Sequence, residues 1–444
     1  MESYAYHYML PDAVKSGRVS MATLDRACRR VLEAKYKLGL FDDPYKYIDE
    51  SRPAKEFFTD EHRAVARKMA GESFVLLKNE NNILPLKKKT TIAVIGPHGN
   101  NRPMMLGPWF YPHDIYRAAT VVEGLKEVSG GKATVLYARG CQPFESEEYE
   151  KRVYFGKEFE KDNRSDEEIL NEALAVAAKA DVIVATLGES TEMSGESSSR
   201  TDLNLPKPQQ ELLKELVKTG KPIVLVLFTG RPLTITWEKE NIPAILNVWF
   251  GGSEAALAIG DVLFGNVNPS GKLTATFPKS VGQIPLFYNH KNTGRPLPQG
   301  AWFQKFRSNY LDVDNEPLYP FGYGLSYTTF SYSDITLDKS SMNINGEITA
   351  TVTVTNTGKY DGSEVVQLYI RDLIGSVTRP VKELKGFEKI FLKAGESKQV
   401  SFKLTADMLK FYNYNLDFVC EPGDFEVMIG GDSRDVNKAL FLLQ

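Results

Sequence analysis

The stretch 188–213, GESTEMSGESSSRTDLNLPKPQQELL, gathers residue types that can transfer protons. It directly follows the apolar run 180–187. A Glu in a loop that closes over a bound substrate can act as general acid and base, and partial burial raises the pKa of such a Glu toward the working pH. The plainer interpretation is a solvated, serine-rich surface loop. The charged residues concerned are Glu189, Glu192, Glu196, Arg200 and Asp202.

The elements around this loop predict where it lies. Helical patterns run from a capping box at Ser165 through Ala180 and over 206–219. Apolar strands without alternation, separated by such helices, predict a mostly parallel α/β sheet that is covered on both faces. Ligands bind outside the carboxyl ends of such strands, which is where the loop emerges. The predicted strands are 91–95, 133–137, 181–187, 222–228 and 244–249.

Two other motifs in this layer are weaker. GESTE is similar to a turn that carries a nucleophilic serine, but that turn needs a Gly two residues after Ser190, where Glu192 stands. IGPHGNN follows a strand, yet it lacks the third Gly of a dinucleotide loop and the Lys-Ser/Thr pair of a phosphate loop. The interpretation of this chain as a small-molecule-binding α/β protein therefore depends on the sheet and the GPHG loop alone.

Trp109 lies in GPWF, a loop framed by Gly and Pro after the first of these strands. A tryptophan in this place either belongs to the core or serves as an aromatic platform for the apolar face of a sugar ring. The residues themselves leave both interpretations open.

Different patterns flank the α/β layer. Residues 20–39 form an amphipathic helix with Ser20 as its N-cap and Gly39 at its end, and almost no sequence precedes its apolar stripe, which predicts a larger domain upstream. Pro, Gly, Asn and aromatic residues over 277–327 predict a long, well-packed connector. Alternating apolar residues then predict the short strands of a β-sandwich. These strands are expected at 348–354, 366–370, 400–404 and 425–429.

Composition narrows the class of protein. The 444 residues carry 54 Lys and Arg against 57 Asp and Glu, so no basic excess predicts a nucleic-acid or anionic-membrane partner. No apolar run reaches the roughly 20 residues of a membrane helix. The five histidines show no metal-ligand spacing, so we expect neither a metal nor another cofactor. Cys28, Cys141 and Cys420 are expected to be small buried hydrophobic residues.

Several stretches together resemble the C-terminal part of family 3 glycoside hydrolases, in particular of the periplasmic β-glucosidase type. They include LGESTEMSGESSSRTDLNLP, GKPIVLVLFTGRPL, LYPFGYGLSYTTF and the run from ILNVWFGGSE to NTGRP, in family order along essentially the whole chain. The resemblance implies the last helices of a (β/α)8 barrel over 1–50 and an α/β sandwich over 51–280. It further implies a connector over 281–330 and a fibronectin type III-like domain over 331–444.

The resemblance also implies a mechanism and roles. Family members are retaining hydrolases, in which one carboxylate attacks the anomeric carbon and another protonates the leaving oxygen. The acid/base of the family's GE-x-x-x-R segment maps onto Glu196, with Arg200 closing the motif. Trp109 matches an aromatic residue on the leaving-group side of the cleft. Glu192 and Glu189 then shape the loop as hydrogen-bond acceptors, and we expect Trp109, Arg200 and Glu192 to contact substrate.

One part of the family pattern is missing. The family nucleophile is an Asp in a Ser-Asp-Trp-like motif of the barrel, whereas the Ser-Asp pairs here are Ser165-Asp166, which caps a helix, and Ser333-Asp334, which opens the sandwich. We therefore expect this chain to supply the acid/base of an exo-acting β-glucosidase, to need the N-terminal barrel as a partner and to be inactive alone.

Alternatives remain within and beyond this expectation. A β-xylosidase or mixed exo-glycosidase is the nearest one, because the absent barrel mostly selects the sugar, and a non-catalytic carbohydrate-binding protein is another. β-Glucosides or oligosaccharides are the expected ligands. The resemblance favours a periplasmic or secreted location and is compatible with a homodimer.

Overall fold

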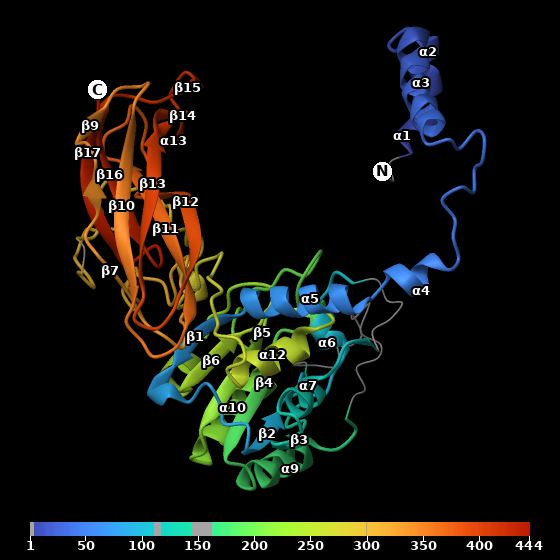
Figure 1. Ribbon diagram of the computed structural model, residues 1–444, viewed down its shortest axis with the longest axis vertical. Coiled ribbons are helices and arrows are strands. Elements are labelled where there is room, and N and C mark those ends of the chain that lie inside the picture. The colour runs from blue at the N-terminus through green and yellow to red at the C-terminus, as the bar shows by residue number, and fades with distance from the viewer. Residues whose placement is uncertain (1–3, 111–116, 144–161, 299) are drawn as a thin grey trace. The chain divides into compact units, whose positions relative to one another are not determined.

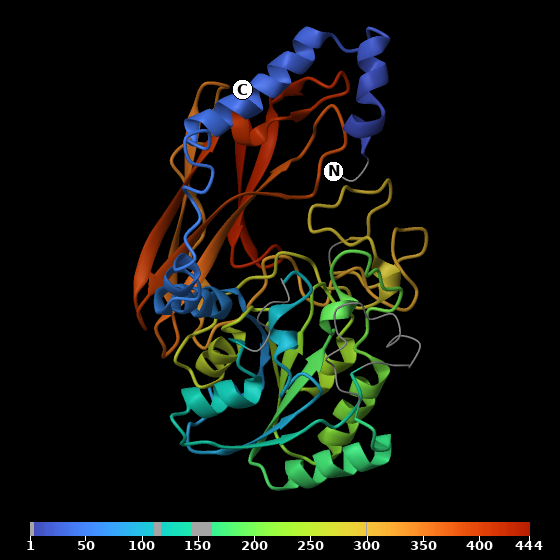
Figure 2. The same ribbon diagram turned by 90° about the vertical axis from the view of Figure 1, so that its right-hand side faces the viewer.

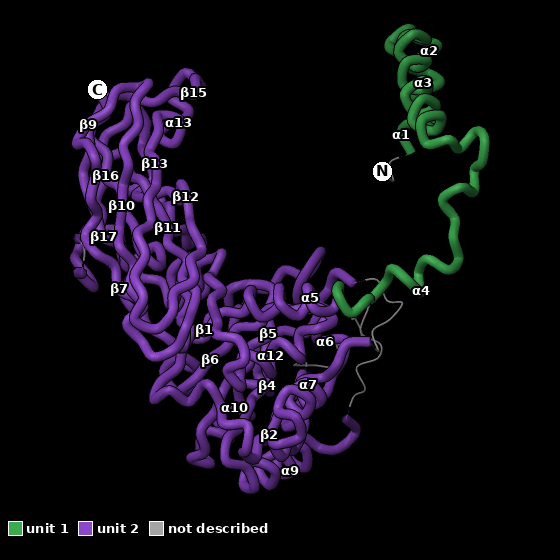
Figure 3. Tube along the Cα trace, viewed as in Figure 1, with its two compact units in different colours: residues 1–62 green, residues 63–444 purple. Residues whose placement is uncertain are grey.

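The computed structural model describes residues 4–110, 117–143, 162–298 and 300–444 (Figure 1). The chain divides into two compact units, residues 1–62 and 63–444 (Figure 3). Each unit is built from its own contacts, and the candidate site lies in the second.

The first unit is helical. Its longest helix, α3 (Met21–Lys37), begins as predicted at Ser20, whose side chain accepts a hydrogen bond from the Thr23 amide. Gly39 follows the helix with φ +71°, a backbone conformation that glycine adopts without strain. None of the described residues 4–62 is buried. The other helices are α1 (Ala5–Tyr8), α2 (Leu10–Lys15) and α4 (Arg52–Glu56), and α5 (Asp60–Ser73) continues into the second unit.

A six-stranded sheet forms the centre of the α/β part, in the order β1-β6-β5-β4-β2-β3. The five predicted strands pair in parallel, as their apolar runs indicated. A sixth strand, β1, was not predicted and pairs antiparallel with β6 at the edge. The strands are β1 (Val75–Asn79), β2 (Thr91–Ile95), β3 (Thr134–Ala138), β4 (Val182–Gly188), β5 (Ile223–Phe228) and β6 (Ala244–Asn247).

Helices cover both faces of this sheet, as predicted. α7 (Val121–Val128) and α12 (Ala255–Leu263) pack on one face, whereas α9 (Asp166–Ala178) and α10 (Lys207–Lys218) pack on the other. Figure 2 shows the strands between these layers. Alternate strand residues supply the two cores, because successive side chains of a strand point to opposite faces. Short elements α6 (Pro103–Leu106), α11 (Thr236–Asn241), η1 (Glu80–Asn82), η3 (Thr191–Met193) and η4 (Val281–Gln283) complete this part.

The connector is only partly packed, which corrects the expectation for 277–327. Phe277, Leu318 and Tyr319 belong to the core on the α9 and α10 face of the sheet. Between 291 and 312, by contrast, nearly every described residue is exposed, and Phe306 is 75% exposed. A stretch without apolar periodicity can bury only the short pieces that reach an existing core.

Two antiparallel sheets enclose the third core and form the predicted β-sandwich. One sheet has the order β13-β10-β7, with β8 also paired to β10, and the other has the order β12-β11-β16-β17-β9. Along β10, buried residues alternate with less buried ones, as a two-layer sandwich requires. The longer strands are β10 (Glu347–Asn356), β11 (Gly362–Asp372), β12 (Glu383–Leu392), β13 (Ser397–Thr405), β16 (Gly423–Gly430) and β17 (Val436–Leu443). The short elements are β7 (Phe330–Tyr332), β8 (Thr336–Leu337), β9 (Ser341–Met342), α13 (Ala406–Leu409), β14 (Phe411–Tyr412) and β15 (Phe418–Val419).

The cysteine expectation was wrong for two of three residues. Cys141 is buried, but Cys420 is half-buried and Cys28 lies exposed on α3. Within the described ranges, no helix combines the length and apolarity that a membrane crossing requires.

Candidate active site

The loop singled out by its carboxylates begins at the buried end of β4. Gly188, the last residue of β4, donates from its amide to Gln209 Oε1 at 2.7 Å, and its carbonyl accepts from Gln209 Nε2 at 3.0 Å. His98 Nε2 lies 3.1 Å from the same carbonyl oxygen. A carbonyl oxygen only accepts hydrogen bonds, so Nε2 must carry the proton and donate it in this bond. Burial lowers the pKa of His98 to about 4, so the ring is neutral at pH 7 and acts as a fixed donor.

Glu189 follows at once and is fully buried. Its Oε1 lies 3.1 Å from Arg200 Nη1 and 3.0 Å from Arg231 Nε. Its Oε2 accepts hydrogen bonds from the Thr229 hydroxyl at 3.0 Å and the Gly230 amide at 3.1 Å. A buried carboxylate needs such partners because it loses its hydration. Glu189 is thus the anionic centre of a structural cluster, which confirms its interpretation as a loop-shaping acceptor.

The two arginines of this cluster hold the loop on both sides of its tip. Arg231 donates from Nη2 to the carbonyl of Met193 and, at 2.7 Å, to that of Ser198. Arg200 donates from Nη2 to the Asn204 carbonyl at 3.1 Å. Arginine suits this task because its planar guanidinium presents several donors in a fixed arrangement. The segment between Met193 and Ser198 is therefore fixed at both ends.

Glu196 occupies the tip of that segment. Gly195 before it has φ +98° and Ser197 after it has φ +60°, so a residue with a positive φ stands on each side of the glutamate and the chain turns sharply there. Such backbone strain persists only where the surroundings impose it, and it is common at functional sites. Glu196 is exposed, and no described residue forms an ion pair with its carboxylate.

Trp109 lies beside the same tip. A side-chain carbon placed on Gly195 would stand 2.9 Å from Pro108 Cβ and 3.6 Å from Trp109 Nε1, so only glycine fits this approach. Trp109 is 75% exposed, which excludes a core role. The structure thus places the exposed indole beside Gly195, the residue directly before the exposed Glu196, in the loop that leaves the carboxyl end of β4.

The other predicted site residues lie deeper in the loop. Arg200 has a side chain only 15% exposed, and its guanidinium is directed at Glu189 and Asn204. Glu192 is half-buried in η3. The substrate contacts expected for both remain predictions.

Arg231, His98 and Gln209 were not singled out from the sequence as site residues, although they hold this loop in place. A usable signal existed for two of them, because His98 and Arg231 each follow a strand neighbouring β4 at its carboxyl end. Both are among the polar residues that directly follow the parallel strands, so that position in the sequence marks them as candidate site residues.

This arrangement suits proton transfer to a ligand placed against the indole. The loop presents the carboxyl group of Glu196 to solvent, while the charge of Glu189 is neutralised below it by two arginines. Rigid positioning matters because proton transfer needs heavy atoms at hydrogen-bonding distance.

Known proteins of one family match this chain along nearly its whole length. The glycosyl hydrolase family 3 C-terminal domain matches residues 74–327, and a fibronectin type III-like domain matches residues 364–433. The chain is 47% identical to a periplasmic β-glucosidase of Salmonella typhimurium, over 99% of this chain and 58% of that protein. It is 42% identical to a β-xylosidase of Formosa agariphila, over 98% of this chain and 57% of that protein.

A solved structure shows the same fold. The chain is similar to a β-glucosidase of Listeria innocua, crystallised in complex with glucose, with a TM-score of 0.87 and 38% sequence identity. The match covers 100% of this chain and 58% of that one. This chain therefore spans a little more than half the length of the proteins it matches.

Proposed function

This chain belongs to glycosyl hydrolase family 3, and on that premise we propose that it supplies the acid/base of a retaining, exo-acting β-glucosidase that removes terminal β-D-glucosyl residues. The observation that carries the proposal is the position of Glu196, exposed at a rigid tip beside the exposed Trp109. A proton donor next to an aromatic platform is what the departing sugar oxygen needs.

In this mechanism Glu196 acts twice. It first donates its proton to the glycosidic oxygen, and its carboxylate then deprotonates the water that hydrolyses the glycosyl-enzyme intermediate. The Asp nucleophile comes from a (β/α)8 barrel outside these 444 residues, roughly 5 to 5.5 Å from Glu196 when both parts are joined. Trp109 stacks on the leaving group. Arg200 and Glu192 bind substrate at the edge of the loop, where the ion pair of Arg200 with Glu189 keeps the loop in shape.

The proposal also assigns the remaining parts. Residues 1–50 are the last helices of the barrel, and their entirely unburied apolar stripe supports this assignment. Residues 51–280 are the α/β sandwich domain that carries the acid/base loop. Residues 281–330 are the connector to residues 331–444, which form the fibronectin type III-like domain. We place the whole enzyme in the periplasm or outside the cell, in keeping with the relative from Salmonella typhimurium. A homodimer stays a prediction.

The test is Glu196→Gln in the enzyme that includes the barrel, assayed with β-glucosides of decreasing leaving-group ability. The kcat/KM for alkyl glucosides should fall by about 10²- to 10⁴-fold, whereas a dinitrophenyl glucoside, whose departure needs no protonation, should keep its kcat/KM, which reports the first step. The kcat for the dinitrophenyl glucoside should fall, because the second step loses its general base. Azide should restore turnover and yield a β-glucosyl azide. Glu211→Gln, an exposed glutamate on α10, is the matched control. An unchanged rate on alkyl glucosides would move the role to Glu192.

Of two alternative functions, the first has specific support. The β-xylosidase of Formosa agariphila makes xylosides the first alternative substrate, and the ratio of kcat/KM for aryl glucoside and aryl xyloside decides between them. A non-catalytic carbohydrate-binding protein is the second alternative. The 444-residue chain should be inactive alone whether it is part of a hydrolase or a carbohydrate-binding protein, so its inactivity does not distinguish the two. The decisive measurement uses the protein in the form that its organism makes. Sugar binding without turnover in that protein would favour a non-catalytic carbohydrate-binding protein.

A further inference from the structure

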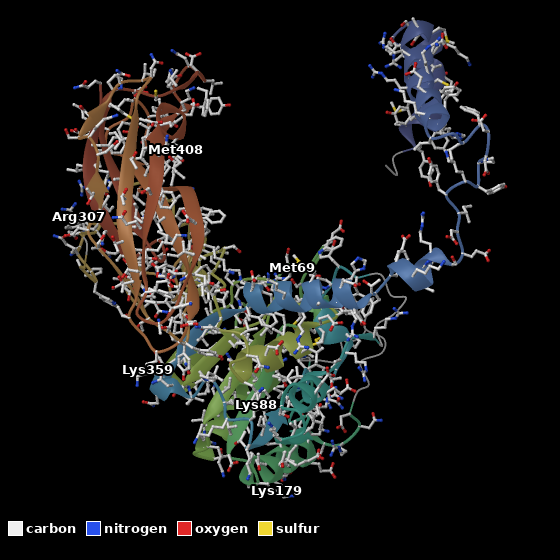
Figure 4. All side chains as sticks on the ribbon, viewed as in Figure 1. Met69, Lys88, Lys179, Arg307, Lys359 and Met408 are labelled. Carbon is white, nitrogen blue, oxygen red and sulfur yellow. The ribbon has the colours of Figure 1, made fainter. Side chains whose placement is uncertain are left out.

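A groove of about 800 Å³ lies where the α/β part meets the β-sandwich, away from the Glu196 loop. One wall comes from the loop 265–270 and Tyr327, and the other comes from residues 359–363 and 389–391 of β11, β12 and the turn before β11. Figure 4 shows Lys359 at the end of the sandwich that adjoins the α/β part. Clefts of this size between two domains are common places for ligand binding.

The walls of the groove are fixed relative to each other. Asn268 donates from Nδ2 to the carbonyl of Asp361 at 2.9 Å, and its Oδ1 accepts from the Tyr327 amide at 2.8 Å. Lys389 Nζ lies 3.0 Å from Glu72 Oε2, across the same junction. Close to the groove, Lys272 and Glu364 form a further ion pair of 2.8 Å. A groove that is preformed in this way loses little conformational entropy when a ligand binds.

Two aromatic side chains are available in this groove. Phe391 is 58% exposed and Tyr360 is 51% exposed, although both line it. Phe391 on β12 pairs directly with Ser363 on β11, so a ring and a hydroxyl group stand side by side on one face of the sheet. An apolar ring face next to hydrogen-bonding groups fits the two kinds of surface that a pyranose presents.

The charges in the groove indicate a neutral ligand. Its charged residues are two lysines, Lys359 and Lys389, and two acids, Glu72 and Asp361. With equal numbers of each sign, the groove favours neither an anion nor a cation. These side chains and Ser363 can instead serve as donors and acceptors for hydroxyl groups.

From these observations we infer that the groove is a second carbohydrate-binding site, which takes a neutral oligosaccharide with one ring stacked on Phe391 and another against Tyr360. The inference rests on the proposed function insofar as that function makes glycosides the molecules this protein meets. Such a site would hold one end of a glucan chain while another end is processed elsewhere on the enzyme.

Isothermal titration calorimetry of the 444-residue chain with cellotetraose tests this inference, in a Glu196→Gln background so that the measurement does not depend on the expected inactivity of the chain alone. Phe391→Ala and Tyr360→Ala should each weaken binding about tenfold or more. Phe387→Ala is the matched control, because Phe387 lies on the same strand, is 68% exposed and does not line the groove. It should leave the dissociation constant unchanged. Ser363→Ala, a smaller change, should weaken binding in the same direction.

Three outcomes would overturn the inference: no binding up to about 10 mM cellotetraose, equal effects of Phe391→Ala and Phe387→Ala, or binding that depends on Trp109 and not on Phe391. An unchanged thermal unfolding midpoint for each variant shows that the fold is retained. The two proposals fail separately. Persistent hydrolysis of alkyl glucosides by Glu196→Gln would refute the acid/base role and leave the groove untouched, whereas absent cellotetraose binding refutes only the groove.

Discussion

Arg200 and Glu189 form a buried ion pair of 3.1 Å beneath the loop that carries Glu196. The glutamate that directly follows β4 is therefore not the one offered to a ligand. Glu189 is the counter-charge that holds Arg200 in place. It also pairs with Arg231, which in turn binds the loop. In this carboxylate-rich loop, Glu189 is therefore a buried structural anion, whereas Glu196 is exposed to solvent.

Replacing Glu189 with Leu should destabilise the protein by about 3 kcal/mol, because two largely buried guanidinium groups would lose their anion. Urea-induced unfolding should show a lower midpoint than in the wild type. Glu211→Gln, whose parent side chain is 61% exposed, should leave the midpoint unchanged. Equal midpoints for Glu189→Leu and the wild type would contradict a structural role for the cluster.

Gly195→Ala should displace the acid relative to the indole. Gly195 has φ +98°, and an added carbon would meet Pro108 at 2.9 Å, so the tip must shift away from Trp109. In the enzyme with its barrel we expect kcat/KM for alkyl glucosides to fall by about a hundredfold, the usual cost of misplacing a catalytic group by about an ångström.

The control for this substitution is Gly220→Ala. Gly220 also has a positive φ, but an added carbon there meets no atom within 4 Å, so the variant carries the backbone strain without the clash. It should retain activity. A similar loss of activity in both variants would show that strain alone, and not the approach to Trp109, causes the effect.

Glu238 on α11 should make stability depend on pH. Burial raises the pKa of this carboxyl group from 4.5 to about 7, and no described residue pairs with either of its oxygens. The folded state therefore binds a proton that the unfolded state releases between these two values. The free energy of unfolding should fall as the pH rises from 4.5 to 7, by an amount on the order of 3 kcal/mol, and this loss should be complete above pH 7.

Glu238→Gln removes this titration, so the difference in unfolding free energy between variant and wild type should grow in favour of the variant across the same pH range. Unfolding series at pH 4.5, 6 and 8 would measure it. Glu240→Gln, an exposed neighbour on the same helix, should show no such trend. A difference that stays constant with pH would mean that Glu238 is ionised in the folded protein.

Sequence patterns predicted the strands of the α/β sheet better than those of the β-sandwich. The β-branched runs of β2 to β6 indicate strands because each is apolar on both faces. β1, β12 and β17 were missed. β1 and β12 lie at the edges of their sheets, where part of the strand faces solvent and the periodic apolar signal weakens. An edge position does not explain every miss, because the edge strands β3 and β13 were predicted and β17 lies between β16 and β9.

By itself, the sequence determined the order of strands and helices, the position of the loop after β4 and, through its family resemblance, the choice of Glu196. Without that resemblance the residues could not separate the roles of neighbouring glutamates, because Glu189, Glu192 and Glu196 share one residue type and one loop. Only the tertiary structure decided that Glu189 is buried and that Trp109 is exposed beside Gly195. The physical reason is that the partners of Glu189 include groups following β5, which parallel pairing brings next to β4 although they are distant along the chain.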